Sequence, residues 1–190
     1  MSSMTQICNL ALSYLGCRRI DSPTEESEEA RAAQLHYEVC KNEILRSVSW
    51  NFARRVSTVA RLDKEVPGWG GVYQLPLDCL YVIDLHGQAG ATMPQGEYRL
   101  AGREVLCHLE KPWLEYISGE IDPMNFDALF VTALAYRLAG AMAHDLTGNG
   151  SLTNQMGQLY QQALAEARLA NGTEGNQEVF QSRRYVEVEE

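Results

Sequence analysis

The sequence predicts an α+β fold that is mainly α: an antiparallel four-helix bundle, a small β-rich insertion between helices 2 and 3, and an extended C-terminal arm. Apolar residues recur at helical spacing before residue 50 and again after residue 121. The stretch between them has the pattern of strands and turns. We therefore expect a bundle formed by residues 1–53 and 121–172, an insertion at 54–120 and an arm at 173–190.

Size and composition limit the classes of protein that fit. A chain of 190 residues can bury a core without disulfides or metals. Sixteen Lys and Arg against 25 Asp and Glu give a net charge of −9, so neither nucleic acid nor an anionic membrane should attract the whole surface. Five cysteines without a C-x-x-C pair favour a reducing compartment. The N-terminus lacks the basic segment of a signal peptide.

The first predicted helix has an apolar face with members three and four residues apart. These members are Met4, Ile7, Cys8, Ala11, Leu12 and Leu15. Ser3 and Gln6 form a plausible capping box at its start, and Gly16 supplies a left-handed residue at its end.

The second predicted helix starts at Ser22–Pro23, with proline at the first helical position. Acidic residues then crowd its first turns, where the helix dipole stabilises negative charge; they are Glu25, Glu26, Glu28 and Glu29. An apolar stripe continues from Ala30 to Val48, which indicates that one face of this helix is buried.

Trp50 and Phe52 mark the point where the pattern changes, and we interpret them as the structural junction between the bundle and the insertion. The following segment is locally basic within an acidic protein, through Arg54, Arg55, Arg61 and Lys64. Two interpretations stay open for this segment. It is either a solvated face or a patch that meets an acidic partner or a DNA phosphate.

The insertion contains several short runs typical of strands. A turn-rich break at 67–71 precedes them, and they lie at 72–75, 80–85, 98–100, 105–107 and 114–117. Residues 98–107 suggest a hairpin around Ala101–Arg103. Residues 87–96, mainly Gly, Ala, Gln and Pro, are expected to form an exposed loop. Together these runs predict a small, mostly antiparallel sheet.

Helical patterns return at Asp122–Pro123. Residues 126–144 are apolar almost all round, so this helix must be covered on most sides; because it contains Arg137, we interpret it as buried and not as a membrane span. Ser151 is predicted to cap the last helix and Asn171–Gly172 to end it. Beyond residue 172 the chain is polar and acidic apart from Phe180 and Tyr185, which is typical of a disordered segment or of an arm that orders on a partner.

The sequence offers no catalytic motif, and we expect no catalytic, cofactor or metal site. His36 lies near the apolar stripe of the second helix, one heptad before Glu43. We interpret it as a surface or half-buried histidine.

Order and spacing of several segments give the chain a family resemblance. The most specific are W-N-F-A at 50–53 and Y-Q-L-P-L-D-C at 73–79; the others lie at 7–12, 15–16 and 27–30. From about Ile7 to Ala170 the chain resembles the phage head-to-tail adaptors, whose best-known members are the tail tubular proteins, or gatekeepers, of short-tailed phages.

The resemblance implies a structural virion protein made in the host cytoplasm, not an enzyme. It implies a helical bundle with a β-rich insertion, and a ring, commonly of twelve copies, between the portal protein and the tail nozzle or tail tube. Double-stranded DNA would pass through without sequence-specific contact, and a net acidic wall suits that passage because many Lys and Arg contacts would hold the duplex. No membrane is involved.

A ring requires contacts between different patches of neighbouring subunits. The candidates are the glutamine-rich face of the last helix and a pairing of Arg54, Arg55, Arg61 and Lys64 with the acidic turns that contain Glu25 and Glu28. The segment around Phe180 and Tyr185 is a candidate to order on the portal by adding a strand to a sheet edge.

Two other classes remain as alternatives. A cytoplasmic interaction domain or DNA-packaging regulator would be indicated by tight, salt-dependent DNA binding. A small helical enzyme would be indicated by a pocket that gathers His36, Glu43 and another titratable group.

Overall fold

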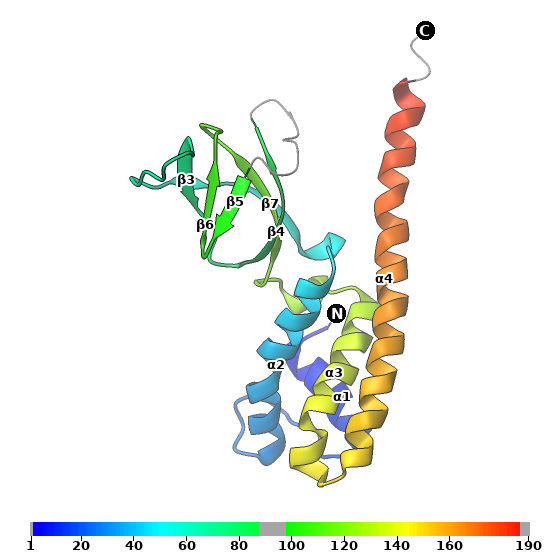
Figure 1. Ribbon diagram of the computed structural model, residues 1–190. Helices are drawn as coiled ribbons and strands as arrows, with labels where there is room; N and C mark the ends of the chain where they lie inside the picture. Colours follow the sequence, from blue (N-terminus) through cyan, green and yellow to red (C-terminus); the bar gives the residue numbers. More distant parts are fainter. Residues whose placement is uncertain (1, 88–97, 187–190) are drawn as a thin grey trace. The chain divides into compact units, whose positions relative to one another are not determined.

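The computed structural model describes residues 2–87 and 98–186, with side chains described as far as Glu174 (Figure 1). The predicted exposed loop therefore lies, apart from Gly87, outside the described residues. The chain divides into two compact units. The helical unit is formed by Met1–Phe52 and Ile121–Glu190, and the sheet unit by Ala53–Glu120.

Helix α1 (Met4–Leu15) begins and ends at the residues whose local chemistry predicts it. Ser3 accepts a hydrogen bond from the backbone of Gln6, whose side chain bonds back to Ser3, so the capping box is confirmed. Gly16 has a φ of 70° and closes the helix in the left-handed conformation, also as predicted.

Helix α2 (Glu28–Ser47) begins later than the sequence predicts. Its cap is Ser27, whose Oγ accepts the backbone N–H of Ala30 at 3.2 Å, and not Ser22. The Glu25 carboxylate accepts the backbone N–H of Asp21 at 2.8 Å, which holds the preceding chain in a loop. Side-chain bonding of this kind competes with helix formation.

Helix α3 (Ala128–Thr147) follows a short 3-10 turn, η2 (Pro123–Asn125). The Asp127 carboxylate caps it by accepting the backbone N–H groups of Leu129 and Phe130. Gly148, with a φ of 64°, ends it. The prediction that this helix is covered on most sides is confirmed, because its buried residues are Phe130, Ala133, Leu134, Ala135, Leu138, Ala139, Met142 and Ala143.

Helix α4 (Gly150–Val186) corrects three predictions. It begins at Gly150, so Ser151 lies inside the helix and is not its cap. It does not end at Asn171–Gly172, and residues 173–186 continue the helix instead of forming an extended arm. Asn171 does not cap because its side chain bonds to Ser49 and Asn51. No proline follows, and Glu, Gln and Arg, which are frequent after residue 173, are good helix formers.

The predicted antiparallel four-helix bundle is also wrong. Helix α3 packs against each of the other three helices, whereas α1 and α2 make few contacts with each other. In Figure 1, α3 lies between α2 and α4. The small residues of α3, such as Ala133, Ala135 and Ala139, let neighbours approach it closely from several sides.

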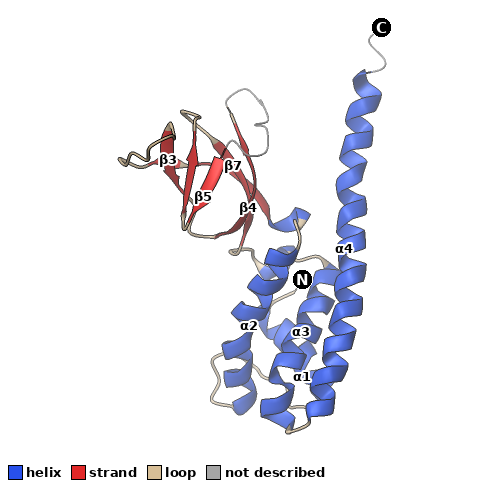
Figure 2. Cartoon of the chain, viewed as in Figure 1, coloured by secondary structure: helices blue, strands red, loops and turns tan. Residues whose placement is uncertain are grey.

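The described residues of the sheet unit form seven strands in two antiparallel sheets (Figure 2). The first sheet has the order β1-β7-β4, with bounds Arg54–Thr58, Trp113–Ser118 and Cys79–His86. The second has the order β2-β3-β6-β5, with bounds Ala60–Arg61, Gly71–Gln74, Glu104–Cys107 and Tyr98–Ala101. A 3-10 turn, η1 (Asn51–Ala53), precedes β1.

Seven strands in two sheets exceed the small single sheet that the sequence predicted, so the fold is a mixed α+β fold and not a helical bundle with a minor insertion. The strands that the sequence analysis missed are β1 and β2. Their residues are exposed apart from Ser57, and arginines interrupt the apolar pattern. Backbone pairing with β7 and β3, and not burial, forms them.

One apolar core lies within the sheet unit and takes residues from both sheets: Tyr73, Leu75, Cys79, Leu85, Val105, Cys107, Leu114 and Tyr116. Beside it, the Trp69 ring stacks on His108 with centroids 5.4 Å apart. Burial of these side chains away from water is the main force holding the unit together.

The link from β3 to β4 is the Y-Q-L-P-L-D-C segment, and hydrogen bonds fix it. The Asp78 carboxylate accepts bonds from Tyr116, at 3.2 Å, and Ser118, at 2.6 Å. Arg103 donates to the carbonyls of Cys79, at 2.9 Å, and Pro76. The polar residues of this motif therefore have a structural explanation.

Candidate functional site

The predicted basic segment lies in the sheet unit, and its first two arginines are already paired there. Arg54 lies 2.9 Å from Glu115. Arg55 lies 3.2 Å from Asp78 and donates to the Glu120 carbonyl at 2.7 Å. Both partners belong to the same unit, so part of the positive charge of this segment is compensated within it.

The other two basic candidates also bond within the sheet unit. Arg61 donates to the carbonyl of Gly70 at 2.9 Å, and Lys64 lies 2.7 Å from Glu104. Each of the four predicted cations therefore has an acceptor in its own unit. A strong phosphate-binding patch at this segment is not favoured by such pairing.

The acidic candidates lie before and in the first turn of α2. Glu25 accepts hydrogen bonds from Ser27, Arg18 and the Asp21 backbone. The bond from Ser27, followed by that from Asp21, lowers the pKa of Glu25. Glu28 is exposed in the first helical turn. Of this pair, only Glu28 is left without an intramolecular donor among the described residues.

Phe180 and Tyr185 lie on the helical backbone of α4, and their side chains are outside the described part of the chain. Their predicted role on the portal stays a prediction. The proposed mode, in which an extended segment adds a strand, does not fit a helix.

Trp50 and Phe52 belong to an aromatic cluster in the helical unit. Trp50 is 1 % exposed, and its indole Nε1 donates to the Ile44 carbonyl at 2.9 Å. Its ring meets that of Phe130 edge to face at 5.2 Å, and Phe52 meets Phe130 at 5.0 Å. Such edge contacts stabilise an aromatic core beyond the area that they bury.

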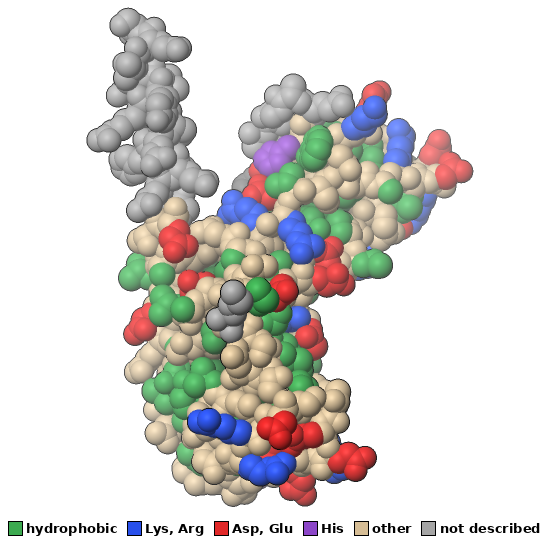
Figure 3. Space-filling model, turned by 180° about the vertical axis from the view of Figure 1, so that it is seen from behind, with side chains coloured by type: hydrophobic (Ala, Val, Ile, Leu, Met, Phe, Trp, Pro, Cys, Tyr) green, Lys and Arg blue, Asp and Glu red, His purple; other side chains and the backbone are tan. Residues whose placement is uncertain are grey.

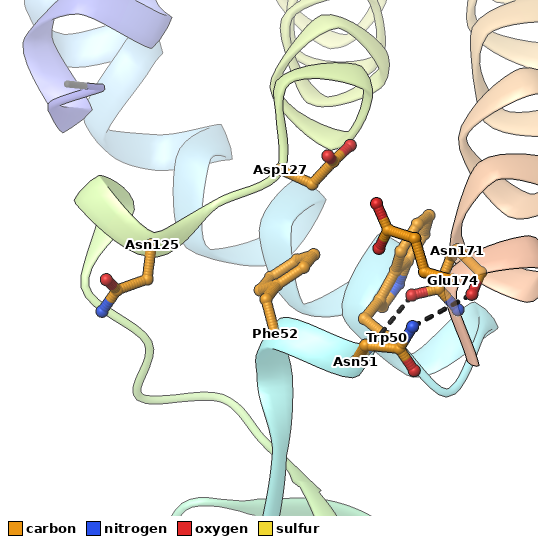
Figure 4. A pocket seen from close by; sticks show the side chains of 7 residues that line it. All are labelled: Trp50, Asn51, Phe52, Asn125, Asp127, Asn171 and Glu174. Atoms are coloured by element: carbon orange, nitrogen blue, oxygen red, sulfur yellow. Dashed lines mark hydrogen bonds between the residues drawn. The ribbon is translucent and has the colours of Figure 1, made fainter. Parts of the chain in front are cut away.

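A hollow of about 220 Å³ opens next to this cluster (Figure 4). Its lining combines aromatic rings, amides and carboxylates from α4, the two 3-10 turns and the residues beside them, including the cap of α3: Trp50, Asn51, Phe52, Asn125, Asp127, Asn171 and Glu174. All seven residues belong to the helical unit. We regard this hollow, named the Asn51 pocket below, as the candidate binding site.

A pair of asparagines forms one wall of the Asn51 pocket. The Asn171 side chain accepts the backbone N–H of Asn51 at 2.8 Å and donates to the Ser49 carbonyl at 3.0 Å. The Asn51 side chain returns a bond to the Asn171 carbonyl at 3.0 Å. These bonds tie the chain after α2 to α4 across 120 positions of sequence.

The described lining of the Asn51 pocket contains two charged side chains, Asp127 and Glu174, and no basic residue. Among the described side chains, none forms an ion pair with either carboxylate. The pocket therefore has two negative charges beside aromatic and amide groups.

A second hollow, of about 280 Å³, lies between α2, α3 and α4. The Arg137 guanidinium in its wall lies 2.8 Å from Glu43. Burial, followed by the Glu43 charge, raises the pKa of Tyr160. His36 does not line this hollow and instead lies 3.9 Å from Asp145. The grouping of His36 with Glu43 that would indicate an enzyme is thus not found at this hollow.

Sequence reasoning assigned five residues of the Asn51 pocket to no site: Asn51, Asn125, Asp127, Asn171 and Glu174. Asp127 precedes an apolar run, which is a usual cap signal and could have been found. Asn171 gives no such signal because its partners are remote in sequence.

The described residues contain no group of three or more His, Cys, Asp or Glu side chains placed to hold a metal ion. Nor does any described helix combine the length and the hydropathy needed to cross a membrane.

Comparison with known proteins does not assign a function to this chain. No family model matches this chain. No curated protein matches it either.

Proposed function

We propose that the chain is a structural head-to-tail adaptor of a phage virion, which assembles as a ring between the portal and the tail and lines the DNA channel. The resemblance of segments 50–53 and 73–79 to that family supports the proposal. In this role the chain contributes contacts with other proteins and carries out no reaction.

The observation that carries the proposal is a pair of exposed surfaces on different helices of the helical unit. Leu35 and Val39, one turn apart on α2, are 67 % and 64 % exposed; we call them the α2 ridge. The α4 stripe is an exposed, uncharged row formed by Gln158, Gln162, Ala165 and Leu169, of which Leu169 is 72 % exposed. Water disfavours the exposed Leu and Val side chains of these surfaces, so a protein partner that covers them and pairs the two glutamine amides would be stabilised.

The placement of the two surfaces suits a ring. Helix α3 lies between α2 and α4 in Figure 1 and packs against both. The α2 ridge of one copy can therefore meet the α4 stripe of the next, and contact between different patches is the condition for a closed ring.

Surface charge fits the passage of DNA. On the face shown in Figure 3, Lys and Arg side chains lie among Asp and Glu side chains and form no single large patch. The net charge is −9. A wall of this kind makes few lasting phosphate contacts, so the duplex slides past it.

The test is the mass of the assemblies that the chain forms with and without the portal protein of the same phage, measured by light scattering after gel filtration. We expect wild-type chain to join the portal as a multimeric ring. The double variant Leu35→Gln with Val39→Gln should not form the ring. The matched control is Leu77→Gln, since Leu77 is 94 % exposed but lies in the sheet unit.

Three outcomes would contradict the proposal. The chain could stay solitary in the presence of portal, or the ridge variant could assemble as the wild type does. Tight, strongly salt-dependent binding of the isolated chain to duplex DNA would indicate a packaging regulator instead.

A further inference from the structure

We propose that the Asn51 pocket binds the guanidinium group of an arginine side chain presented by another polypeptide. The pocket shares no residue with the α2 ridge or the α4 stripe. The inference therefore goes beyond the proposed ring and stands on its own observations.

Charge determines the sign of the ligand. Among the described side chains, Asp127 and Glu174 are the only ionisable residues that line the pocket, and both are acidic. Neither has a cationic partner among the described side chains. The N-terminus of α3 would by itself favour an anion, but one oxygen of Asp127 already accepts its N–H groups, at 2.8 Å from Leu129 and 3.2 Å from Phe130. The site is therefore built for a cation.

The shape of the lining selects a flat cation. Figure 4 shows the carboxylates of Asp127 and Glu174 and the ring of Phe52 around the same space. A guanidinium group is planar, stacks on an aromatic face and donates hydrogen bonds in its own plane to carboxylates. A lysine ammonium lacks that plane and is more strongly hydrated. Arginine thus uses both kinds of group that the pocket offers.

The second oxygen of Asp127 is the natural acceptor. Of the described donors, only the two backbone N–H groups of α3 bond to this carboxylate, and both reach Oδ1. Oδ2 can accept a charge-assisted bond without loss of the helix cap.

The rim explains why the arginine would belong to a polypeptide. Asn125 and Asn51 are exposed, and Asn51 donates through its side chain to Asn171 while its own amide oxygen accepts no bond from a described residue. Amides at the mouth of a pocket can pair with the backbone groups next to an inserted side chain. A small free cation would leave these amides unused.

The test uses the full chain and a capped Gly-Arg-Gly peptide, with the same peptide carrying citrulline as the neutral isostere. Binding is followed by the NMR shifts of the Asn51 and Asn171 side-chain amides. We expect saturable shifts with the arginine peptide and an affinity at least about tenfold lower for citrulline, a difference of about 1.4 kcal/mol.

The matched variants remove charge and keep shape. The double variant Asp127→Asn with Glu174→Gln should lower the affinity for the arginine peptide by about tenfold or more. Asparagine caps a helix as well as aspartate does, so circular dichroism should show an unchanged fold. Glu166→Gln, which removes one carboxylate charge at an exposed α4 position outside the pocket, should bind the arginine peptide as wild type does.

Each other result would overturn the inference. Equal affinity for the two peptides, or unchanged affinity in the double variant, would show that the pocket does not recognise the guanidinium group. At matched ionic strength, free guanidinium ion could bind as tightly as the peptide. That result would show that the pocket is a site for small cations and does not recognise a polypeptide.

Discussion

The Cys8 thiol is the most deeply buried ionisable group of α1, with no exposed surface. Burial raises its pKa to about 12, and a backbone hydrogen bond opposes this only partly. A neutral thiol packed in this way behaves as a small apolar side chain. The thiol therefore affects the free energy of unfolding only at a pH high enough to ionise it in the unfolded chain.

We predict that Cys8 makes folding sensitive to alkali. The folded pKa, about 12, is above that of an unfolded cysteine, about 8.5, so its contribution to stability is complete below about pH 8.5 and is lost as pH rises toward 12. In Cys8→Ala, the free energy of unfolding in urea should fall less steeply with pH, by up to about 1.4 kcal/mol per pH unit. Cys17→Ala, at a partly exposed position, should change the slope less. Equal slopes in wild type and Cys8→Ala would contradict the prediction.

Single residues could be predicted where their partners are close in sequence. The capping box of Ser3 and Gln6 involves residues three apart, and Gly16 closes the same helix. Asn171 could not be predicted, since it bonds to a residue 120 positions away. Most of the Asn51 pocket depends on this second kind of contact, which is why the sequence pointed to Trp50 and Phe52 but not to the hollow beside them.

Helices and strands were predictable to the extent that burial imposes a period on them. Strands β3, β6 and β7 are mostly buried and lie in apolar runs of the sequence, whereas exposed β1 depends on its backbone pairing with β7. The helix formed by residues 173–186 was not predicted for the same reason. Its residues favour a helix but form no apolar stripe, so they give no periodic signal.

We predict that alanine substitutions at two glycines have opposite effects on stability. Gly148 follows the end of α3, and Gly157 lies inside α4. Gly148 ends α3 with a φ of 64°, so Gly148→Ala should destabilise the protein by about 1–2 kcal/mol. Gly157 lies within α4 with open space around its Cα, so Gly157→Ala should stabilise it by about 0.5–1 kcal/mol. Thermal unfolding followed by circular dichroism measures both. A shift of the same sign for the two variants would show that the cap and helix-interior arguments are wrong.

The whole chain is organised as two units joined in sequence at Phe52–Ala53 and Glu120–Ile121. The two ends of the sheet unit lie together, because β1 pairs with β7 and Arg55 donates to the Glu120 carbonyl at 2.7 Å. An element whose ends meet can be inserted in a chain without straining its host.

We therefore predict that residues 53–120 fold alone. Their own apolar core and the Asp78 hydrogen bonds lie within this range, so the NMR spectrum of the isolated fragment should be dispersed. Asp78→Ala leaves the hydroxyl groups of Tyr116 and Ser118 without this acceptor and should unfold the fragment, since each bond to a charged group contributes about 1.5–3 kcal/mol. A collapsed spectrum of the unmodified fragment would show that the sheet unit depends on the rest of the chain.

The three tryptophans are distributed unequally between the units: Trp50 is buried in the helical unit, while Trp69 stacks on His108 and Trp113 is 42 % exposed in the sheet unit. A buried indole emits at shorter wavelength than one in contact with water. Intrinsic fluorescence can therefore report on the two units separately, without any added dye, as the protein is heated or mixed with a candidate partner.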